Sequence, residues 1–159
     1  MLIVGCGCRG RALAQALAAD GHGVRGSSRD AGRLTEIEAA GAEGVAADPD
    51  RLGTLLPALD GVGVVVWALA SAHGQPDAVA ALHGPRLQSL VAKLVDTPVR
   101  GFVYEAAGTV PASMLDRGAA TVERVARTFR MPAAVVRHTP DDVPGWVEAT
   151  VSAVDRVLG

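Results

Sequence analysis

The sequence predicts an α/β fold with one doubly wound, parallel, six-stranded sheet between two layers of helices. Short apolar runs alternate with helical patterns about six times along the chain, which is typical of parallel sheets covered on both faces. The run at 63–69, GVVVWAL, is apolar throughout, as expected for a strand that is buried on both sides. The length of 159 residues suits one domain, which we expect to span residues 1–159.

The first half of the chain contains three strand–helix pairs. The expected strands are 2–4, 23–27 and 44–47, and the expected helices are 9–20, 30–40 and 52–59. Asp30 and Asp50 precede the second and third helices, where an aspartate side chain can accept a hydrogen bond from the first turn. Gly21 and Gly41 follow the first two helices, at the usual position of a terminating glycine.

The second half continues the alternation. The expected strands are 63–69, 100–108 and 132–137, and the expected helices are 87–94, 111–129 and 147–158. Between them, the segment 71–86 contains Gly74, Pro76 and a Gly-Pro pair, so we expect a loop and a short helix there. Right-handed crossovers between two mononucleotide-binding halves give the strand order 3-2-1-4-5-6.

A sheet of this kind binds its ligand at the carboxyl ends of the first and fourth strands. Ala68, Leu69 and Ala70 end the fourth strand and are therefore expected to contact the ligand.

Charge, hydropathy and cysteine content limit the class of protein. The formal net charge of −2 provides no global basic surface for nucleic acid or an anionic membrane. No apolar run approaches the ~18–20 residues that span a bilayer, and the first run lacks the leader of a signal peptide. Two cysteines cannot form a disulfide framework. We therefore expect a soluble cytoplasmic protein without nucleic-acid or membrane partners.

The stretch GCGCRG at 5–10 has Gly-x-Gly-x-x-Gly spacing between a predicted strand and a predicted helix, the context in which this motif binds a dinucleotide. The first glycine is expected to allow a tight turn, the second to admit a diphosphate, and the third to let the helix pack closely. The helix N-terminus offers unpaired N–H groups to the phosphates. The expected cofactor contacts here are Gly5, Cys6, Gly7, Cys8, Arg9 and Gly10.

A thiol site is the alternative interpretation of this loop. Cys6 and Cys8 are too close in sequence for an unstrained disulfide, and two thiols are too few for a structural zinc site. A helix N-terminus lowers a thiol pKa, which would make Cys8 sensitive to oxidation. The simpler interpretation is that both are small residues filling a tight loop, and we expect no metal site.

The residues after the second strand favour NADP(H) over NAD(H). NAD-binding proteins place an acid about 20 residues after the glycine motif to hold the ribose 2′-hydroxyl. Here Ser27, Ser28 and Arg29 occupy that region, and hydroxyls with a guanidinium suit a 2′-phosphate. Arg9, in the glycine loop, is expected to add a second cation near the same end. Asp30 caps the next helix, or it holds the ribose of NAD(H) if the second strand ends one turn later. Asp48, after the third strand, is either an acceptor for the adenine amino group or part of a turn.

Five stretches in order resemble the extended or atypical short-chain dehydrogenase/reductase family, which includes NAD-dependent epimerases, dehydratases and NAD(P)H-binding proteins. They are GxGxRG at 5–10, GHGVRGSSRD at 21–30, AEGVAADPDRLGTLLPALDGVGVVVWALA at 42–70, VRGFVYEAAGTV at 99–110 and PAAVVR at 132–137. The resemblance covers roughly residues 1–138 and implies a Rossmann fold with a bound nicotinamide cofactor.

The same resemblance implies a serine after the fifth strand and a Tyr-x-x-x-Lys pair in the next helix, and this chain departs from both. Ala106 and Ala107 stand at the serine positions, and Leu115 and Ala119 stand near the tyrosine and lysine positions. Tyr104 lies within the fifth strand, where we expect a buried phenol with one partner.

Three other residues are candidates for chemistry at the same edge of the sheet. Glu105 is either a proton relay beside a nicotinamide or a solvent-facing residue. Thr109 could replace the missing serine hydroxyl. His73 follows the fourth strand and either reaches the cofactor cleft or is an ordinary polar loop residue.

These features predict an NADP(H)-binding, oxidoreductase-like protein with an unidentified small-molecule substrate. The alternative is a non-catalytic dinucleotide sensor or partner-binding module, in which the cofactor orders the segment 71–86. A weaker alternative is a domain that binds another nucleotide, such as a flavin or acyl-CoA. The last strand and helix, with Trp146, are expected to complete the core or to form a homodimer contact.

Overall fold

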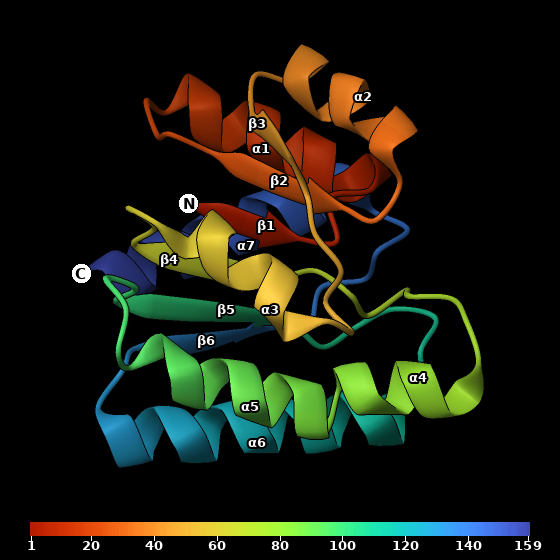
Figure 1. The fold of residues 1–159 in the computed structure, drawn as a ribbon, viewed down its shortest axis with the longest axis vertical. Coiled ribbons are helices and arrows are strands. Elements are labelled where there is room, and N and C mark those ends of the chain that lie inside the picture. Colours follow the sequence, from red (N-terminus) through yellow and green to blue (C-terminus); the bar gives the residue numbers. More distant parts are fainter.

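The computed structural model describes residues 1–159 and confirms the predicted sheet, which is parallel and has the order β3-β2-β1-β4-β5-β6 (Figure 1). The strands are β1 (Leu2–Val4), β2 (Arg25–Ser28), β3 (Glu43–Ala46), β4 (Val64–Trp67), β5 (Gly101–Glu105) and β6 (Ala133–Val136). The α-helices are α1 (Cys8–Ala19), α2 (Leu34–Ala39), α3 (Leu52–Leu55), α4 (Pro76–Leu82), α5 (Pro85–Leu94), α6 (Ala112–Phe129) and α7 (Val143–Leu158). Two 3₁₀ turns, η1 (Ala31–Arg33) and η2 (Leu56–Leu59), complete the fold.

Alternate residues of β1, β4, β5 and β6 enter two separate cores, which gives the three layers. On β5, Phe102 and Tyr104 pack into a core with α5 and α6, whereas Val103 packs into a core with α1, α2 and α7. Both faces are therefore covered by helices, as the continuous apolar sequence of β4 predicts (Figure 1).

The observed helix boundaries differ from the predicted ones where a cap is involved. Asp30 accepts a hydrogen bond from the Gly32 N–H, as predicted, but the segment it caps is a 3₁₀ turn followed by a short α2. The predicted cap at Asp50 is wrong, because this carboxylate pairs with Arg86 at 3.0 Å and α3 has no side-chain cap. The last helix begins at Val143 rather than 147, because Asp142 accepts a hydrogen bond from the Gly145 N–H.

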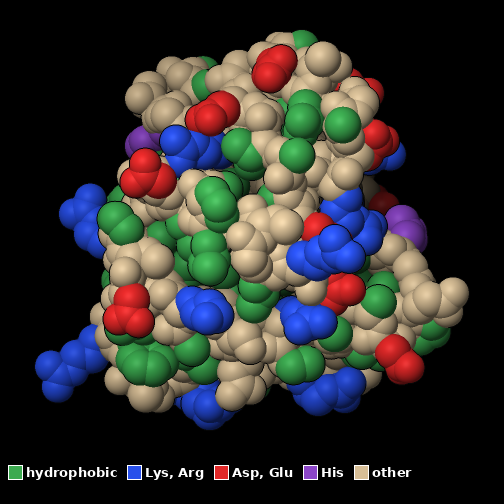
Figure 2. Space-filling model, viewed as in Figure 1, with side chains coloured by type: hydrophobic (Ala, Val, Ile, Leu, Met, Phe, Trp, Pro, Cys, Tyr) green, Lys and Arg blue, Asp and Glu red, His purple; other side chains and the backbone are tan.

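The surface mixes charges of both signs. Figure 2 shows Lys and Arg side chains spread over the part of this face where α5 and α6 lie, with Asp and Glu side chains among them. None of the helices has the length and apolar character that a bilayer crossing would require.

Candidate nucleotide-binding site

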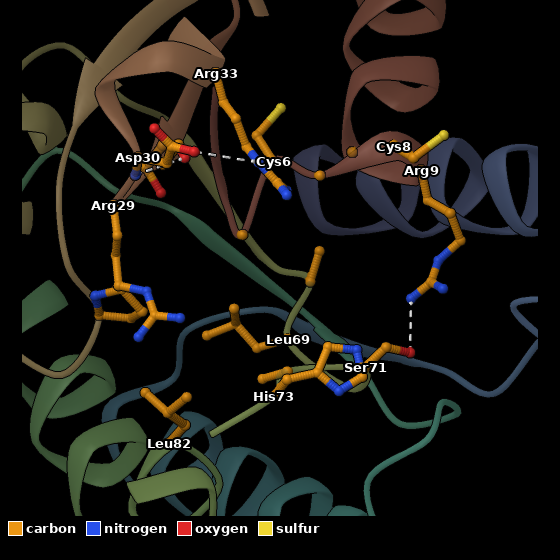
Figure 3. Close-up of a pocket in the computed structure, with 18 of the residues that line it drawn as sticks. Cys6, Cys8, Arg9, Arg29, Asp30, Arg33, Leu69, Ser71, His73 and Leu82 are labelled. Atoms are coloured by element: carbon orange, nitrogen blue, oxygen red, sulfur yellow. Dashed lines mark hydrogen bonds and ion pairs between the residues drawn. The ribbon is translucent and has the colours of Figure 1, made fainter. Parts of the chain in front are cut away.

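A cavity of about 700 Å³ opens at the carboxyl ends of β1, β2, β3 and β4. Its position is the point where the strand order reverses, between β1 and β4, which is where open α/β sheets bind ligands. The cavity is lined by Gly5, Cys6, Gly7, Cys8, Arg9, Gly10, Ser27, Ser28, Arg29, Asp30, Arg33, Ala47, Pro49, Ala68, Leu69, Ser71, Ala72, His73, Leu82 and Trp146 (Figure 3).

The glycine loop has the geometry of a phosphate cradle. Gly5 has a φ of +84°, and a Cβ there would lie 2.5 Å from Leu69 Cδ2 and 2.7 Å from the Ala68 carbonyl oxygen. A Cβ at Gly10 would be 3.3 Å from the Gly5 carbonyl oxygen, so this glycine lets α1 pack on the loop. At Gly7 a Cβ would meet nothing within 4 Å, and the space beside it belongs to the cavity at the N-terminus of α1. These residues fit a diphosphate.

The two cysteines of the loop have different environments. Cys6 is 2 % exposed, and its Sγ would lie 2.6 Å from a Cβ at Gly26, so it packs tightly against β2. Burial raises the pKa of the Cys6 thiol to about 11, which leaves it protonated and unreactive at neutral pH. Cys8 is exposed at the start of α1. Nowhere do three or more His, Cys, Asp or Glu side chains meet in an arrangement that could hold a metal ion.

The end of the cavity formed by β2 is basic. Figure 3 shows Arg29 and Arg33 reaching toward the cavity from the same side. Arg29 is in no ion pair, and Arg33 has only a long contact of 3.7 Å with Asp30. Ser27 is 1 % exposed, and its Oγ has no hydrogen-bond partner, which is unusual for a buried hydroxyl. Two available guanidinium groups and an unpaired hydroxyl fit an anionic, oxygen-rich ligand group.

Part of the cavity lining is apolar. Four of its residues, Ala47, Pro49, Leu69 and Leu82, form what we call the apolar slot, and an apolar lining suits a nucleobase. Asp48 does not line the cavity, and its carboxylate accepts a hydrogen bond from the Asp50 N–H at 3.0 Å. This is the geometry of a local turn, the second of the two interpretations that the sequence allowed.

Arg9 lies at the opposite end of the cavity rather than beside Arg29 as predicted, because it forms a part-buried ion pair with Glu105. Arg9 Nη2 lies 2.6 Å from Glu105 Oε1 and 3.3 Å from Ser71 Oγ, and the guanidinium stacks over the Trp146 ring at 5.4 Å. The other oxygen of Glu105 accepts the Ala70 N–H at 2.9 Å. Burial raises the pKa of Glu105, and the positive charge of Arg9 opposes that rise.

The structure therefore corrects one interpretation of Glu105, which is 1 % exposed and does not face solvent. Thr109 is exposed outside the cavity, and its N–H lies 3.4 Å from Ser71 Oγ. His73 is exposed at the cavity rim. Leu115 and Ala119 are buried on the inner face of α6, so that helix presents no reactive side chain at those positions.

Tyr104 is a buried phenol with one partner, as predicted. Its hydroxyl lies 2.7 Å from His83 Nδ1, and His83 Nε2 lies 3.2 Å from the Leu69 carbonyl oxygen. Because a carbonyl only accepts, Nε2 carries the proton and Nδ1 accepts from the phenol. The neutral imidazole thus ties β5 to Leu69, which lines the cavity. Burial lowers the pKa of His83, because the charged form would be desolvated.

This pair predicts a loss of stability in mild acid. With a folded pKa below the unfolded value of 6.5, the unfolded chain binds more protons, so stability is complete above that pH and falls below it. We expect the free energy of unfolding to be about 1 kcal/mol lower at pH 5.5 than at pH 7.5. Urea unfolding of the wild-type protein and of His83→Gln at both pH values measures this contribution. All other titrating groups are present in both proteins, so the difference between their pH dependences is due to His83. An equal pH dependence of the two proteins would contradict it.

The cavity contains all the predicted cofactor contacts except Asp48 and Ala70, and whether they bind a cofactor stays a prediction. The sequence did not lead us to assign Arg33 to the site, and we expected Trp146 only in the core or at a homodimer contact. Arg33 lies four residues after Arg29, and this helical spacing was the available signal. Trp146 is 1 % exposed and comes to the cavity from α7, a long-range placement for which the sequence carries no signal.

The order of the strands, the glycine loop and the cavity at the reversal point define a Rossmann-type fold. A family described as NAD(P)H-binding matches residues 5–141. The chain belongs to this NAD(P)H-binding family. No curated protein matches the sequence.

Solved structures support the same fold. UDP-glucose 4-epimerase from Thermotoga maritima is 16 % identical, with a TM-score of 0.71 over 86 % of this chain and 54 % of that one. UDP-glucuronic acid 4-epimerase from Bacillus cereus, solved with NAD, is 16 % identical, with a TM-score of 0.68 over 86 % and 55 %. Triphenylmethane reductase from Citrobacter sp., solved with NADP(H), is 18 % identical, with a TM-score of 0.64 over 86 % and 48 %. The chain spans about half the length of these proteins.

Proposed function

We propose that this domain binds NADP(H) in preference to NAD(H). The observation that carries the proposal is the pair of arginines, Arg29 and Arg33, at the β2 end of the cavity. The unpaired, buried Ser27 hydroxyl lies at the same end and supports an oxygen-rich partner there. A 2′-phosphate would gain charge-assisted hydrogen bonds from both guanidinium groups, which a 2′-hydroxyl cannot match.

The rest of the cavity suits the remainder of such a ligand. The apolar slot of Ala47, Pro49, Leu69 and Leu82 would hold the adenine. The open face of Gly7 and the N-terminus of α1 would hold the diphosphate. Bound nicotinamide cofactors supply or accept a hydride, and the structural neighbours include a reductase solved with NADP(H).

The role of the bound nucleotide has two candidates. An oxidoreductase-like activity on a small molecule is favoured by the similarity in fold to reductases and epimerases. The alternative is a module whose binding to a partner depends on the nucleotide. It is favoured because Glu105, the acid best placed for catalysis, is already paired with Arg9. We favour the second candidate, because a carboxylate that is hydrogen-bonded at both oxygens is poorly placed to move a proton.

Cofactor titration tests the preference. We expect NADPH to bind with a dissociation constant at least tenfold below that of NADH, because the second phosphate contacts two cations. Arg29→Ala and Arg33→Ala should each weaken NADPH at least fivefold and leave NADH nearly unchanged. Arg127→Ala, an exposed arginine on α6 outside the cavity, is the matched control. Equal affinities for the two cofactors in the wild-type protein would refute the preference.

A further inference from the structure

The lining of the cavity includes residues from the loops directly after β1 to β4 but none from the loops directly after β5 or β6. In a doubly wound sheet the first three strands bind one mononucleotide and the next three bind the other. The cavity receives residues from the carboxyl ends of β1, β2, β3 and β4, but none from 101–142, which contains β5, β6 and the segments that follow them.

Hydrogen bonds join the segments after β4 and β5. The Ala70 N–H donates to Glu105, and the Ala70 carbonyl accepts the Val110 N–H at 2.9 Å. A Cβ at Gly108 would overlap the Ala70 carbonyl group, so the two backbones are in close contact. Ser71 Oγ adds a further link through the Thr109 N–H. These contacts hold the segments after β4 and β5 against each other.

Arg9 links the glycine loop to the same segments from the other side of the cavity. Its side chain leaves α1 and reaches Ser71 and Glu105, and Figure 3 shows it opposite Arg29 across the cavity. Trp146 of α7 lies against the guanidinium and is 1 % exposed. Glu105 is equally buried, so withdrawing Arg9 would leave a carboxylate without its counter-charge inside the protein. The ion pair therefore opposes any movement that would separate Arg9 from Glu105.

From this geometry we propose that the site recognises the adenosine diphosphate portion of its ligand, with its 2′-phosphate, and gains no affinity from the nicotinamide. The inference rests on the proposed NADP(H) binding and specifies which part of the ligand is recognised. The ligand class is then any adenosine 2′-phosphate 5′-diphosphate, whatever group follows the diphosphate. A site of this kind reports the amount of such nucleotides and is indifferent to the redox state of the nicotinamide.

Calorimetric titration of the wild-type chain with NADP⁺, NADPH and 2′-phospho-ADP-ribose tests the inference. We expect the three dissociation constants to agree within fivefold. Tighter binding of NADP⁺ or NADPH than of 2′-phospho-ADP-ribose by more than fivefold would overturn the inference and leave the proposed NADP(H) binding intact. Binding of none of the three would overturn both. The pair NAD⁺ and ADP-ribose repeats the comparison without the 2′-phosphate and should also agree within fivefold if it binds.

The fluorescence of bound NADPH gives a second readout. A nicotinamide left in solvent should keep the emission maximum and intensity of free NADPH. A blue shift with enhanced emission would show that the ring enters the protein, and would overturn the inference. Arg127→Ala should behave as the wild-type protein in both measurements, because its side chain is exposed on α6 away from the cavity.

Discussion

Replacing Arg9 with alanine is expected to lower the free energy of unfolding by about 3 kcal/mol, the low end of the effect of removing one partner from a buried ion pair, because Arg9 itself is 22 % exposed. Glu105 is 1 % exposed and would lose its only cation, while the Trp146 ring would lose its stacking partner. The large effect arises from the stranded carboxylate and does not measure a net contribution of the pair. Urea unfolding at pH 7.5 measures the difference.

A second substitution separates the charge from the lost packing. Adding Glu105→Gln to Arg9→Ala removes the stranded charge, so we expect the double variant to recover at least half of the loss. The pH dependence gives an independent check. Without Arg9, burial raises the pKa of Glu105 further above its unfolded value of 4.5, so the native state binds the extra proton. The destabilisation should therefore shrink as pH falls from 8 to 5, and a constant or growing difference would contradict this account.

The fold could be predicted because its signals are local and mutually consistent. The longer helices α5, α6 and α7 each have an apolar stripe, and the continuous apolar run of β4 indicates a strand between two helical layers. Right-handed crossovers and the division into two mononucleotide-binding halves then allow one strand order, and the sheet has this order. Asp50 shows where local reasoning fails. An aspartate before a helix resembles a cap, but Arg86 from a distant helix competes for the same carboxylate.

The cavity was predictable where it is built from sequence motifs and unpredictable where distant segments meet. The glycine loop and Ser27 to Arg29 are contiguous with their strands, so their place at the carboxyl edge follows from topology alone. The role of Arg9 depends on Glu105, which is 96 residues away, and on Trp146 in the last helix. A motif-based prediction assigns that cation to the diphosphate, but only the folded chain shows that an internal carboxylate already neutralises it.

A pair of glycine substitutions should separate folding from nucleotide binding within the loop. Gly5→Ala places a methyl group 2.5 Å from Leu69 Cδ2 and 2.7 Å from the Ala68 carbonyl oxygen, at a φ of +84° that alanine avoids. We expect it to lower the free energy of unfolding by about 2–4 kcal/mol, since strain and overlap add. Gly7→Ala meets no neighbour at a φ of −78°, so its cost should stay below about 1 kcal/mol.

The substitution that costs little stability, Gly7→Ala, should nevertheless weaken NADPH binding strongly. The methyl group of Gly7→Ala enters the space where the diphosphate approaches the loop, so NADPH binding should weaken at least tenfold in a protein that remains folded. Gly53→Ala is the matched control, because its Cβ also meets nothing and its position lies outside the cavity. Thermal unfolding and NADPH titration of the three variants provide both quantities. Unchanged NADPH affinity in Gly7→Ala would mean that the diphosphate does not cross this loop, and the phosphate site would then have to lie nearer Arg29 and Arg33.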